Sequence, residues 1–350
     1  MKSYLVGGAI RDKLLGLQPK ERDWVVVGSS QSEMISKGFI QVGKDFPVFI
    51  HPKTGEEYAL ARTERKSGHG YTGFDFNTSS DVTLEQDLER RDLTINAIAQ
   101  DDKGNLIDPF NGKEDIEKKI LRNVSHAFSE DPLRVLRVAR FKCNFPDFTV
   151  AESTTKQIEA IVKNGELQYL TGERIWMELC KSNDPFIFSR ILSEWNAESI
   201  LPGYKKTEYT PNKKYSKFNI LSLFLHHAID DLDSFCKKLK VPNEYKDLAI
   251  LLDNCKDDFL SYIPKHDNHI ELLSIIKKLD IRKTKRLDAF FEIVKNESKY
   301  VHFIETIISE IKNYKLSAAD SKKSVEEIQK IIHNKHCSII KHYISETLNK

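Results

Sequence analysis

The chain has 350 residues, of which 40% are hydrophobic and 30% are charged, and this balance is typical of a globular protein with two or three domains rather than one small module. Its 54 Lys and Arg against 52 Asp and Glu give a net charge of +2, which is too small to indicate a nucleic-acid partner by itself. The apolar runs are much shorter than a membrane span and the N-terminus lacks a signal-peptide pattern, so we expect no membrane segment and a cytoplasmic protein.

The first 125 residues alternate between strand-like and helical patterns. Runs typical of strands cover residues 4–6, 23–27, 47–50 and 57–61, and residues 9–16 are helix-like. Residues 66–80 have no clear period and carry several glycines, so we predict a mobile loop there. This part of the chain indicates an α+β head with a mixed β-sheet.

The chain from Pro132 onward is expected to be helical, because Ile, Leu, Phe and Lys recur there at helical spacing. Pro202-Gly203 and the polar residues 205–215 interrupt this pattern and mark a boundary. We predict a head over residues 1–125, an all-helical neck over 126–204 and a helical body and tail over 205–350. Five scattered cysteines without a C-x-x-C spacing predict reduced thiols rather than a zinc site or disulfides.

Two features near the N-terminus favour phosphate and metal chemistry. Gly7 and Gly8 follow the first strand, where a glycine pair lets the backbone approach a triphosphate, and Arg11 adds positive charge. Glu21 and Asp23 on the next predicted strand would leave the same face roughly 7 Å apart, a spacing at which two carboxylates can share a pair of Mg²⁺ ions. The alternative is an ordinary strand-helix turn followed by a solvated acidic pair.

An arginine-rich cluster covers residues 90–97. Arg90 and Arg91, followed by Asp92 and Asn96, could hold a triphosphate and a ribose hydroxyl together, because Arg binds phosphate through a planar fork. A solvated charge cluster that caps a helix is the alternative.

A second arginine-rich segment covers residues 130–140. Asp131 precedes a proline, so we expect it to be the N-cap of a helix that begins at Pro132. Arg134, Arg137 and Arg140 drift about 60° per step around that helix, which predicts one diagonal cationic stripe. Because Asp accepts and Arg donates hydrogen bonds to base edges, Asp131 and Arg134 could also act as a template made of amino acids.

Four segments together resemble, in their order and spacing, the bacterial class II tRNA nucleotidyltransferases, the CCA-adding enzymes: residues 4–12, 21–28, 90–97 and 130–140. Residues 58–68 are also similar to the bacterial branch of that family. The resemblance covers about residues 1–145 and is faint beyond them. It implies a nucleotidyltransferase-fold head and the Mg²⁺-dependent addition of C, C and A to the tRNA 3′ end from CTP and ATP, without a nucleic-acid template.

The resemblance also implies roles for individual residues. Glu21 and Asp23 would be the catalytic metal ligands, although the family usually has Asp where this chain has Glu21, and Asp131 with Arg134 would read the base. The remaining nucleotide-binding residues would be Gly8, Arg11, Arg91, Arg137 and Arg140. Glu57 is either a third carboxylate or an ordinary strand-edge residue. The loop at 66–80 could close over the nucleotide.

Some relatives carry a metal-dependent phosphohydrolase domain of the HD type in their helical half. Here that half offers His226-His227 without an adjacent Asp, and His266-Asp267 in a polar turn, so we expect the hydrolase activity to be absent. Basic pairs such as Lys277-Lys278 are either solvated helix surface or the place where the tRNA backbone binds.

The sequence therefore predicts a CCA-adding enzyme with tRNA as partner, CTP and ATP as substrates and no obligate protein partner. Two alternatives stay open: a poly(A) polymerase of the same superfamily, which shares these motifs, and a catalytically inactive RNA-binding relative, which Glu21 in place of Asp would motivate.

Overall fold

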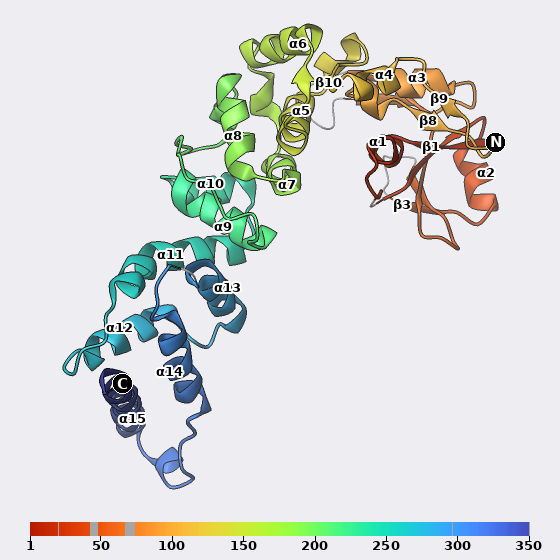
Figure 1. Ribbon diagram of the computed structural model, residues 1–350. Helices are drawn as coiled ribbons and strands as arrows, with labels where there is room; N and C mark the ends of the chain where they lie inside the picture. The colour runs from red at the N-terminus through yellow and green to blue at the C-terminus, as the bar shows by residue number, and fades with distance from the viewer. Residues whose placement is uncertain (20, 43–47, 67–73, 296, 350) are drawn as a thin grey trace. The chain divides into compact units, whose positions relative to one another are not determined.

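The computed structural model (Figure 1) describes residues 1–19, 21–42, 48–66, 74–295 and 297–349, with the side chains of 64–66 and 74–76 outside the description. The chain divides between Pro202 and Gly203 into two compact units. The first unit contains a mixed sheet and helices, and the second is built of helices. This α+β architecture confirms the predicted fold class.

A seven-stranded sheet forms the centre of the head within the described residues, in the order β3-β4-β5-β2-β1-β8-β9. Only β2 and β5 are parallel, and the other neighbours are antiparallel, so the sheet is mixed as predicted. The strands are β1 Lys2–Val6, β2 Asp23–Val27, β3 Ile40–Val42, β4 Val48–Ile50, β5 Glu57–Leu60, β8 Ala99–Gln100 and β9 Leu106–Ile107. β3, β8 and β9 were not predicted; the two residues of β8 and of β9 are too few for a strand pattern to register.

The loop predicted at 66–80 is wrong at Lys66 and at residues 74–77, which lie in strands, whereas residues 78–80 belong to no helix or strand. β6 Thr63–Lys66 and β7 Phe74–Asn77 pair as antiparallel strands. Residues 67–73, the centre of the predicted loop, lie outside the described residues.

The sheet separates two apolar clusters because side chains alternate along each strand. Val25 of β2 packs with Val6 and Leu88 on one face. The next residue, Val26, packs with Met34 and Phe49 on the other face. Asp23 shares the parity of Val25 and therefore lies at the end of the first cluster.

Helices complete the first unit, and α5 lies against α7 and α8. α5 begins at Leu133, one residue later than predicted, and its buried face includes Val135 and Leu136. A two-residue parallel pair, β10 Ile120–Leu121 and β11 Thr149–Val150, places one short strand within the predicted neck. The helices are α1 Gly8–Leu14, α2 Gln31–Ser36, α3 Leu84–Glu89, α4 Gly112–Glu117, α5 Leu133–Asn144, α6 Glu152–Lys163, α7 Gly172–Lys181 and α8 Pro185–Glu194, with 3₁₀ turns at Thr94–Asn96, His126–Glu130, Glu166–Tyr169 and Glu198–Ile200.

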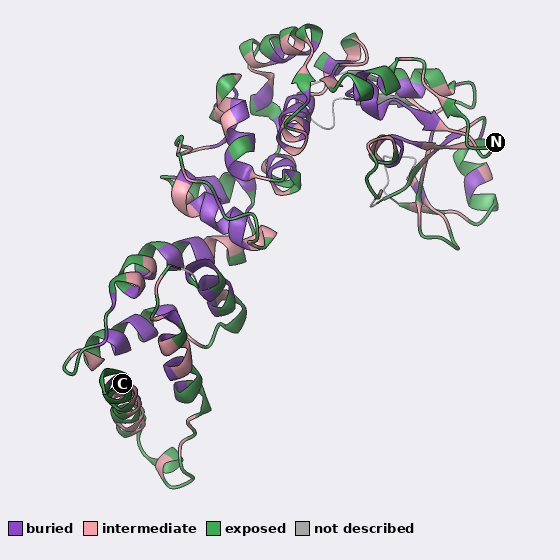
Figure 2. Cartoon of the chain, viewed as in Figure 1, coloured by how far each residue is buried: buried purple, intermediate pink, exposed green. Residues whose placement is uncertain are grey.

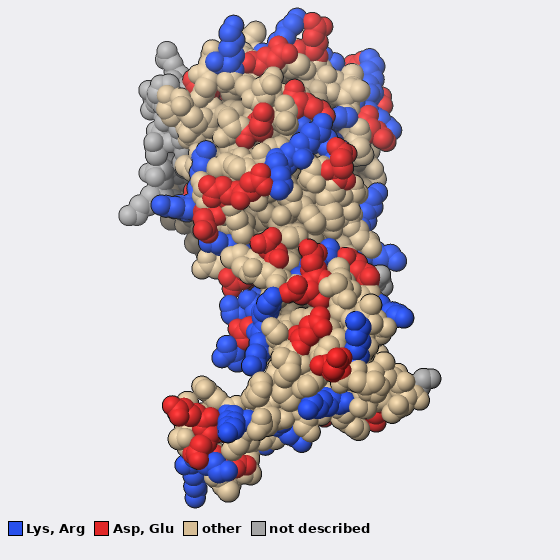
Figure 3. Space-filling model, turned by 90° about the vertical axis from the view of Figure 1, so that its left-hand side faces the viewer, with Lys and Arg blue, Asp and Glu red and all other residues tan. Residues whose placement is uncertain are grey.

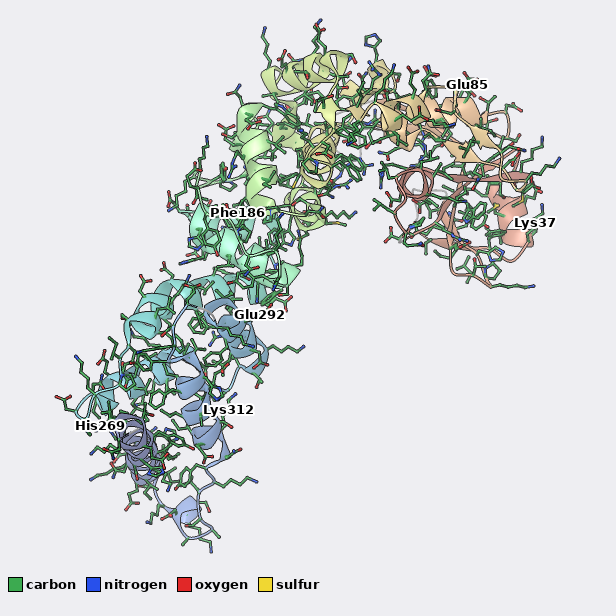
Figure 4. All side chains as sticks on the ribbon, in the orientation of Figure 1. Lys37, Glu85, Phe186, His269, Glu292 and Lys312 are labelled. Carbon is green, nitrogen blue, oxygen red and sulfur yellow. The ribbon has the colours of Figure 1, made fainter. Side chains whose placement is uncertain are left out.

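The second unit is helical, as predicted. Its helices are α9 Lys217–Ala228, α10 Leu232–Leu239, α11 Asn243–Ser261, α12 His269–Leu279, α13 Thr284–Val294, α14 Val301–Asn313 and α15 Val325–Leu348, with a 3₁₀ turn at Asp320–Lys322. Buried residues run along α9, α11 and α13 (Figure 2). Asn219 of α9 is fully buried and donates to Glu292 of α13, labelled in Figure 4, at 2.8 Å. None of the helices in the described ranges is long and apolar enough to cross a membrane.

Basic and acidic side chains are interspersed on the face drawn in Figure 3. This pattern agrees with the small net charge, and functional clusters of one sign must therefore be sought locally.

Candidate active site

The turn between β1 and α1 is built around Gly7. Its φ of 69° and ψ of −128° strain any residue with a Cβ atom. The N–H of Gly7 donates to the carbonyl of Ile98 at 3.2 Å, and its own carbonyl accepts the N–H groups of Ile10 and Arg11 at 3.1 Å. A Cβ atom added at Gly7 would lie 2.9 Å from Nη1 of Arg91. The glycine therefore lets this guanidinium lie directly against the turn.

Asp23, the first residue of β2, lies beside this turn, opposite Val6 of β1 and Glu57 of β5. Because paired residues on neighbouring strands project to the same face, Asp23 and Glu57 leave the sheet next to each other. Burial raises the pKa of Asp23, while Arg91 opposes this shift and Glu21 adds to it. The two carboxylates of the predicted pair and Arg91 are thus within electrostatic reach of one another.

Glu21 lies before β2, so the prediction that both carboxylates lie on one strand is wrong for Glu21. The strand begins only at Asp23 because its ladder partner, Val6, is the last residue of β1. Across the described ranges, no three His, Cys, Asp or Glu side chains are close enough together to hold a metal ion. Glu21, Asp23 and Glu57 therefore form a loose group of hard oxygen donors rather than a closed metal site.

A buried carboxylate orients the guanidinium of Arg91. Asp87 of α3, whose side chain is fully buried, accepts Nη2 of Arg91 at 3.2 Å and Nη2 of Arg90 at 2.8 Å. Burial alone would raise the pKa of Asp87, but the two arginines hold it below its ordinary value. Nη1 of Arg91 donates to the carbonyl of Asn96 at 3.4 Å, whereas its Nε is buried with no hydrogen-bond partner in the described structure. An anion at this face of Arg91 would satisfy that donor.

A chain of hydrogen bonds links α1 to α5. Nη1 of Arg11 donates to Oδ1 of Asn96 at 2.6 Å, Nδ2 of Asn96 donates to Asp92 at 3.0 Å, and Nε of Arg137 donates to Asp92 at 2.7 Å. Burial alone would raise the pKa of Asp92, but the Arg137 guanidinium and Asn96 hold it well below its usual range. Gly8, the first residue of α1, lies beside Arg11, whose Nη2 would be 3.5 Å from an added Cβ atom. Asp92 and Asn96 thus position two of the predicted nucleotide-binding arginines.

Arg140 of α5 is anchored in a similar way. Its Nε donates to the buried carboxylate of Glu178 on α7 at 2.6 Å. The guanidinium groups of Arg11, Arg137 and Arg140 all lie over the ring of Phe141. Three predicted nucleotide-binding residues therefore gather around one aromatic ring.

Asp131 and Arg134 each have partners of their own. The N-cap residue of α5 is Pro132 rather than Asp131 as predicted, but Oδ1 of Asp131 still accepts the N–H of Leu133, the first residue of the helix, at 3.0 Å. Oδ2 of Asp131 lies 3.1 Å from Nη2 of Arg174. Arg134 is buried and donates to the carbonyls of Ala127 and Arg90. The prediction of one continuous cationic stripe is therefore wrong at Arg134, because backbone carbonyls have turned its guanidinium into the core.

The structure thus brings Arg91 next to the Gly7 turn and the acid pair, and gathers Arg11, Arg137 and Arg140 around the ring of Phe141. Sequence reasoning missed Asp87, Phe141 and Glu178, which contact these arginines, and Arg174, which pairs with Asp131. Asp87 had a signal, since it lies four residues before Arg91 on a helix. Arg174 and Glu178 had none, because they lie 43 and 38 positions from their partners.

In the second unit, the histidine pairs do not assemble a metal site among the described residues. His226 and His227 lie on α9, where His227 stacks on Tyr209 with ring centroids 3.8 Å apart. His266 and Asp267 lie in an exposed turn, as predicted.

Comparison with known families agrees with this geometry. Residues 3–122 match the family model described as the poly A polymerase head domain. The head is therefore that of a nucleotidyltransferase, a class that generally uses divalent metal ions.

Relatives identify the family more closely. A CCA-adding enzyme of Coxiella burnetii is 46% identical over 306 residues, which cover 83% of this chain and 80% of the relative. The Bacillus stearothermophilus CCA-adding enzyme in complex with CTP has a TM-score of 0.66 at 23% identity, over 97% of this chain and 88% of that one. The Thermotoga maritima CCA-adding enzyme complexed with tRNA has a TM-score of 0.63 at 20% identity, over 99% of this chain and 91% of that one. The chain belongs to the family of CCA-adding enzymes, as its motifs predicted.

Proposed function

We propose that this chain adds C, C and A to the 3′ end of tRNA from CTP and ATP in the cytoplasm, with Mg²⁺ as its metal. Residues 1–125 would be the catalytic head, 126–204 the neck that recognises the base, and 205–350 the body and tail that bind tRNA. The observation that carries the proposal is the meeting of Asp23, Gly7 and Arg91 at one end of the sheet. Phosphoryl transfer needs three features at one point: a carboxylate for the metal, a turn that admits phosphate, and an arginine with an unpaired buried donor.

The donor set suits a hard divalent cation. Glu21 and Asp23 offer carboxylate oxygens, and Glu57 stands opposite Asp23 in the strand register, so we assign Glu57 as a third carboxylate of the same site. Bound there, Mg²⁺ would lower the pKa of the tRNA 3′-hydroxyl and neutralise charge on the triphosphate. The three carboxylates are loosely arranged, which suits a Mg²⁺ ion that would also be bound by the phosphates of the substrate.

The arginines would bind the triphosphate. Arg91 has a buried Nε without a described partner, which a phosphate oxygen would satisfy. Arg137 and Arg140 are each held through Nε by a carboxylate, an anchorage that leaves their Nη atoms to form a fork for phosphate. Arg11 and the backbone at Gly8 would complete this cationic wall.

Asp131 and Arg134 would read the base edge, and Arg134, which is buried against the carbonyls of Ala127 and Arg90, would have to exchange one of these contacts to do so. Both already have protein partners, so we propose that an incoming base exchanges with, or shares, the Arg174 contact of Asp131. The tRNA 3′-hydroxyl would then attack the α-phosphorus of CTP or ATP, and pyrophosphate would leave toward Arg91, Arg137 and Arg140, which stabilise its charge.

Labelled CTP and ATP incorporation tests the proposal. A tRNA transcript that lacks its 3′ CCA is incubated with CTP alone, ATP alone or both, and the products are sized on a gel. We expect two added residues with CTP alone and three with both nucleotides. Long products with ATP alone would indicate a poly(A) polymerase, and no incorporation under any condition would indicate an inactive relative.

A further inference from the structure

Phe141 of α5 lies under three cations. Its ring centroid is 4.3 Å from the guanidinium carbon of Arg140, 5.0 Å from that of Arg11 and 5.9 Å from that of Arg137. All three distances are within the range in which the face of an aromatic ring attracts a cation. The ring is 2% exposed, so it meets these charges in a desolvated setting.

Gathering three guanidinium groups has an electrostatic cost. Burial lowers the pKa of Arg11, and the charge of Arg140 acts in the same direction against the favourable charges of Asp12 and Asp92. Each arginine has one carboxylate partner: Asp12 for Arg11, Asp92 for Arg137 and Glu178 for Arg140. The ring adds attraction to all three at once, without adding a negative charge that would repel a triphosphate.

The ring and the carboxylates fix different degrees of freedom. Asp92 and Glu178 hold Arg137 and Arg140 through Nε. A single hydrogen bond at Nε leaves the guanidinium free to tilt about the side chain, and contact with a ring face restricts that tilt. Arg11 comes from α1, whereas Arg137 and Arg140 come from α5, so Phe141 also joins two elements of the first unit.

We propose that Phe141 is a positioning residue for nucleotide binding: its ring holds the guanidinium groups of Arg11, Arg137 and Arg140 in one cluster that receives the triphosphate of CTP or ATP. The inference rests on the proposed nucleotide-binding role of these arginines. The competing explanation is that Phe141 only fills the core, where its ring stacks on Phe145 with centroids 6.3 Å apart and planes inclined by 5°.

Fluorination separates the two explanations because it weakens the attraction of a ring for cations while nearly preserving its shape. Phe141 is replaced by 4-fluoro-, 3,5-difluoro- and 3,4,5-trifluorophenylalanine in the full-length chain, and Kd is measured for CTP and for cytidine. We expect CTP binding to weaken stepwise with each fluorine, by about tenfold over the series, while cytidine binding and Tm change little. CTP binding that is the same across the series would overturn the proposal.

Two further variants separate loss of the ring from loss of packing volume. Phe141→Leu removes the ring and should weaken CTP binding and raise KM more than it lowers kcat. Phe188→Leu on α8 creates a similar loss of volume in the same unit, at a fully buried ring with no described arginine over it, and should lower Tm without a selective loss of CTP binding. Equal losses of CTP binding in both variants would show that Phe141 acts through the core.

Arg137→Gln tests the underlying assumption separately. If this variant binds CTP as tightly as the unmodified chain, the proposed nucleotide site itself is wrong. If Arg137→Gln loses CTP binding while the fluorinated series does not, the site stands and only the role of Phe141 is overturned.

Discussion

Asp131 and Arg174 form an ion pair in which Oδ2 of Asp131 lies 3.1 Å from Nη2 of Arg174. The other oxygen of the same carboxylate accepts the N–H of Leu133 at 3.0 Å and so caps α5. One side chain therefore caps α5 and also forms an ion pair with the neighbouring helix α7. A base that approaches Asp131 meets a carboxylate whose orientation is already fixed from both sides.

The first prediction concerns base selection by this carboxylate. Asp131→Asn keeps one oxygen, which can still accept the N–H of Leu133 and preserve the cap. Its amide nitrogen takes the place of the oxygen that faces Arg174, and this nitrogen donates where the carboxylate accepts. CTP and ATP present an amino donor at this edge, whereas UTP and GTP present a carbonyl. Because an unpaired buried polar group costs about 1 to 3 kcal/mol, we expect selectivity for CTP over UTP to fall by about tenfold to a hundredfold.

The measurement is kcat/KM for each of the four nucleotides on one tRNA substrate. Arg137→Ala is the control, since losing a phosphate contact should weaken all four nucleotides alike. If Asp131→Asn lowers Tm but leaves selectivity unchanged, Asp131 is a helix cap and no more.

The second prediction concerns the acid pair. Asp23→Ala removes a carboxylate from the proposed metal site, and we expect transfer of labelled CTP to fall by at least about a thousandfold with an unchanged circular dichroism spectrum. Glu21→Asp should retain activity, because the shorter carboxylate is still a hard oxygen ligand. Turnover by Asp23→Ala near that of the unmodified chain would refute the metal assignment.

The third prediction concerns the Gly7 turn. Gly7→Ala forces a Cβ atom to within 2.9 Å of Nη1 of Arg91 at a positive φ, whereas Gly16 has a similar φ of 73° and no neighbour within 4 Å of such an atom. Both alanine variants should lose stability by about 1 to 3 kcal/mol from backbone strain. Only Gly7→Ala should also weaken CTP binding, because only there must Arg91 move. Equal CTP affinities in the two variants would show that Arg91 does not bind the nucleotide from this position.

The sequence predicted two central strands of the sheet and the helical second unit well. The strand-like runs at 23–27 and 57–61 identified β2 and β5, and helical periodicity identified the second unit. The run at 23–27 begins where β2 begins, but the interpretation of Glu21 and Asp23 as a pair on one strand extended that strand two residues too far. A strand boundary depends on where the neighbouring strand ends, which the carboxylate spacing does not encode. That is why the strand assignment of Glu21 is wrong while that of Asp23 is correct.

The residues of the candidate site were named from motifs, and the structure adds the residues that contact them. Arg134 is a residue that local patterns could not place. Its spacing suggested a surface residue, but its guanidinium donates to the carbonyls of Ala127 and Arg90. No local sequence pattern indicates that these two segments pack against Arg134. Glu178 is a similar case, since a glutamate on an amphipathic helix is usually solvated and only tertiary packing brings it to Arg140.

The fourth prediction concerns acid sensitivity of the second unit. His226 Nδ1 and His227 Nε2 are buried without a hydrogen-bond partner in the described part of the chain. Burial lowers the pKa of His227 to about 4, and the charges of His226, Lys256 and Lys205 act in the same direction. An unfolded histidine has a pKa of about 6.5, so the folded unit favours the neutral ring.

The sign of the pH effect follows from this difference. The unfolded chain binds the proton first, so the stability associated with a neutral His227 is fully present above about pH 6.5 and is lost as the pH falls toward about 4. His227→Phe preserves the stacking on Tyr209, which has ring centroids 3.8 Å apart, and removes the titration. We therefore expect the Tm of this variant to fall less between about pH 7 and about pH 4.5 than that of the unmodified chain, as followed by circular dichroism. His302→Gln, at an exposed position on α14, is the matched control and should leave the profile unchanged. The same decline of Tm in His227→Phe as in the control would mean that other groups, and not His227, govern unfolding in acid.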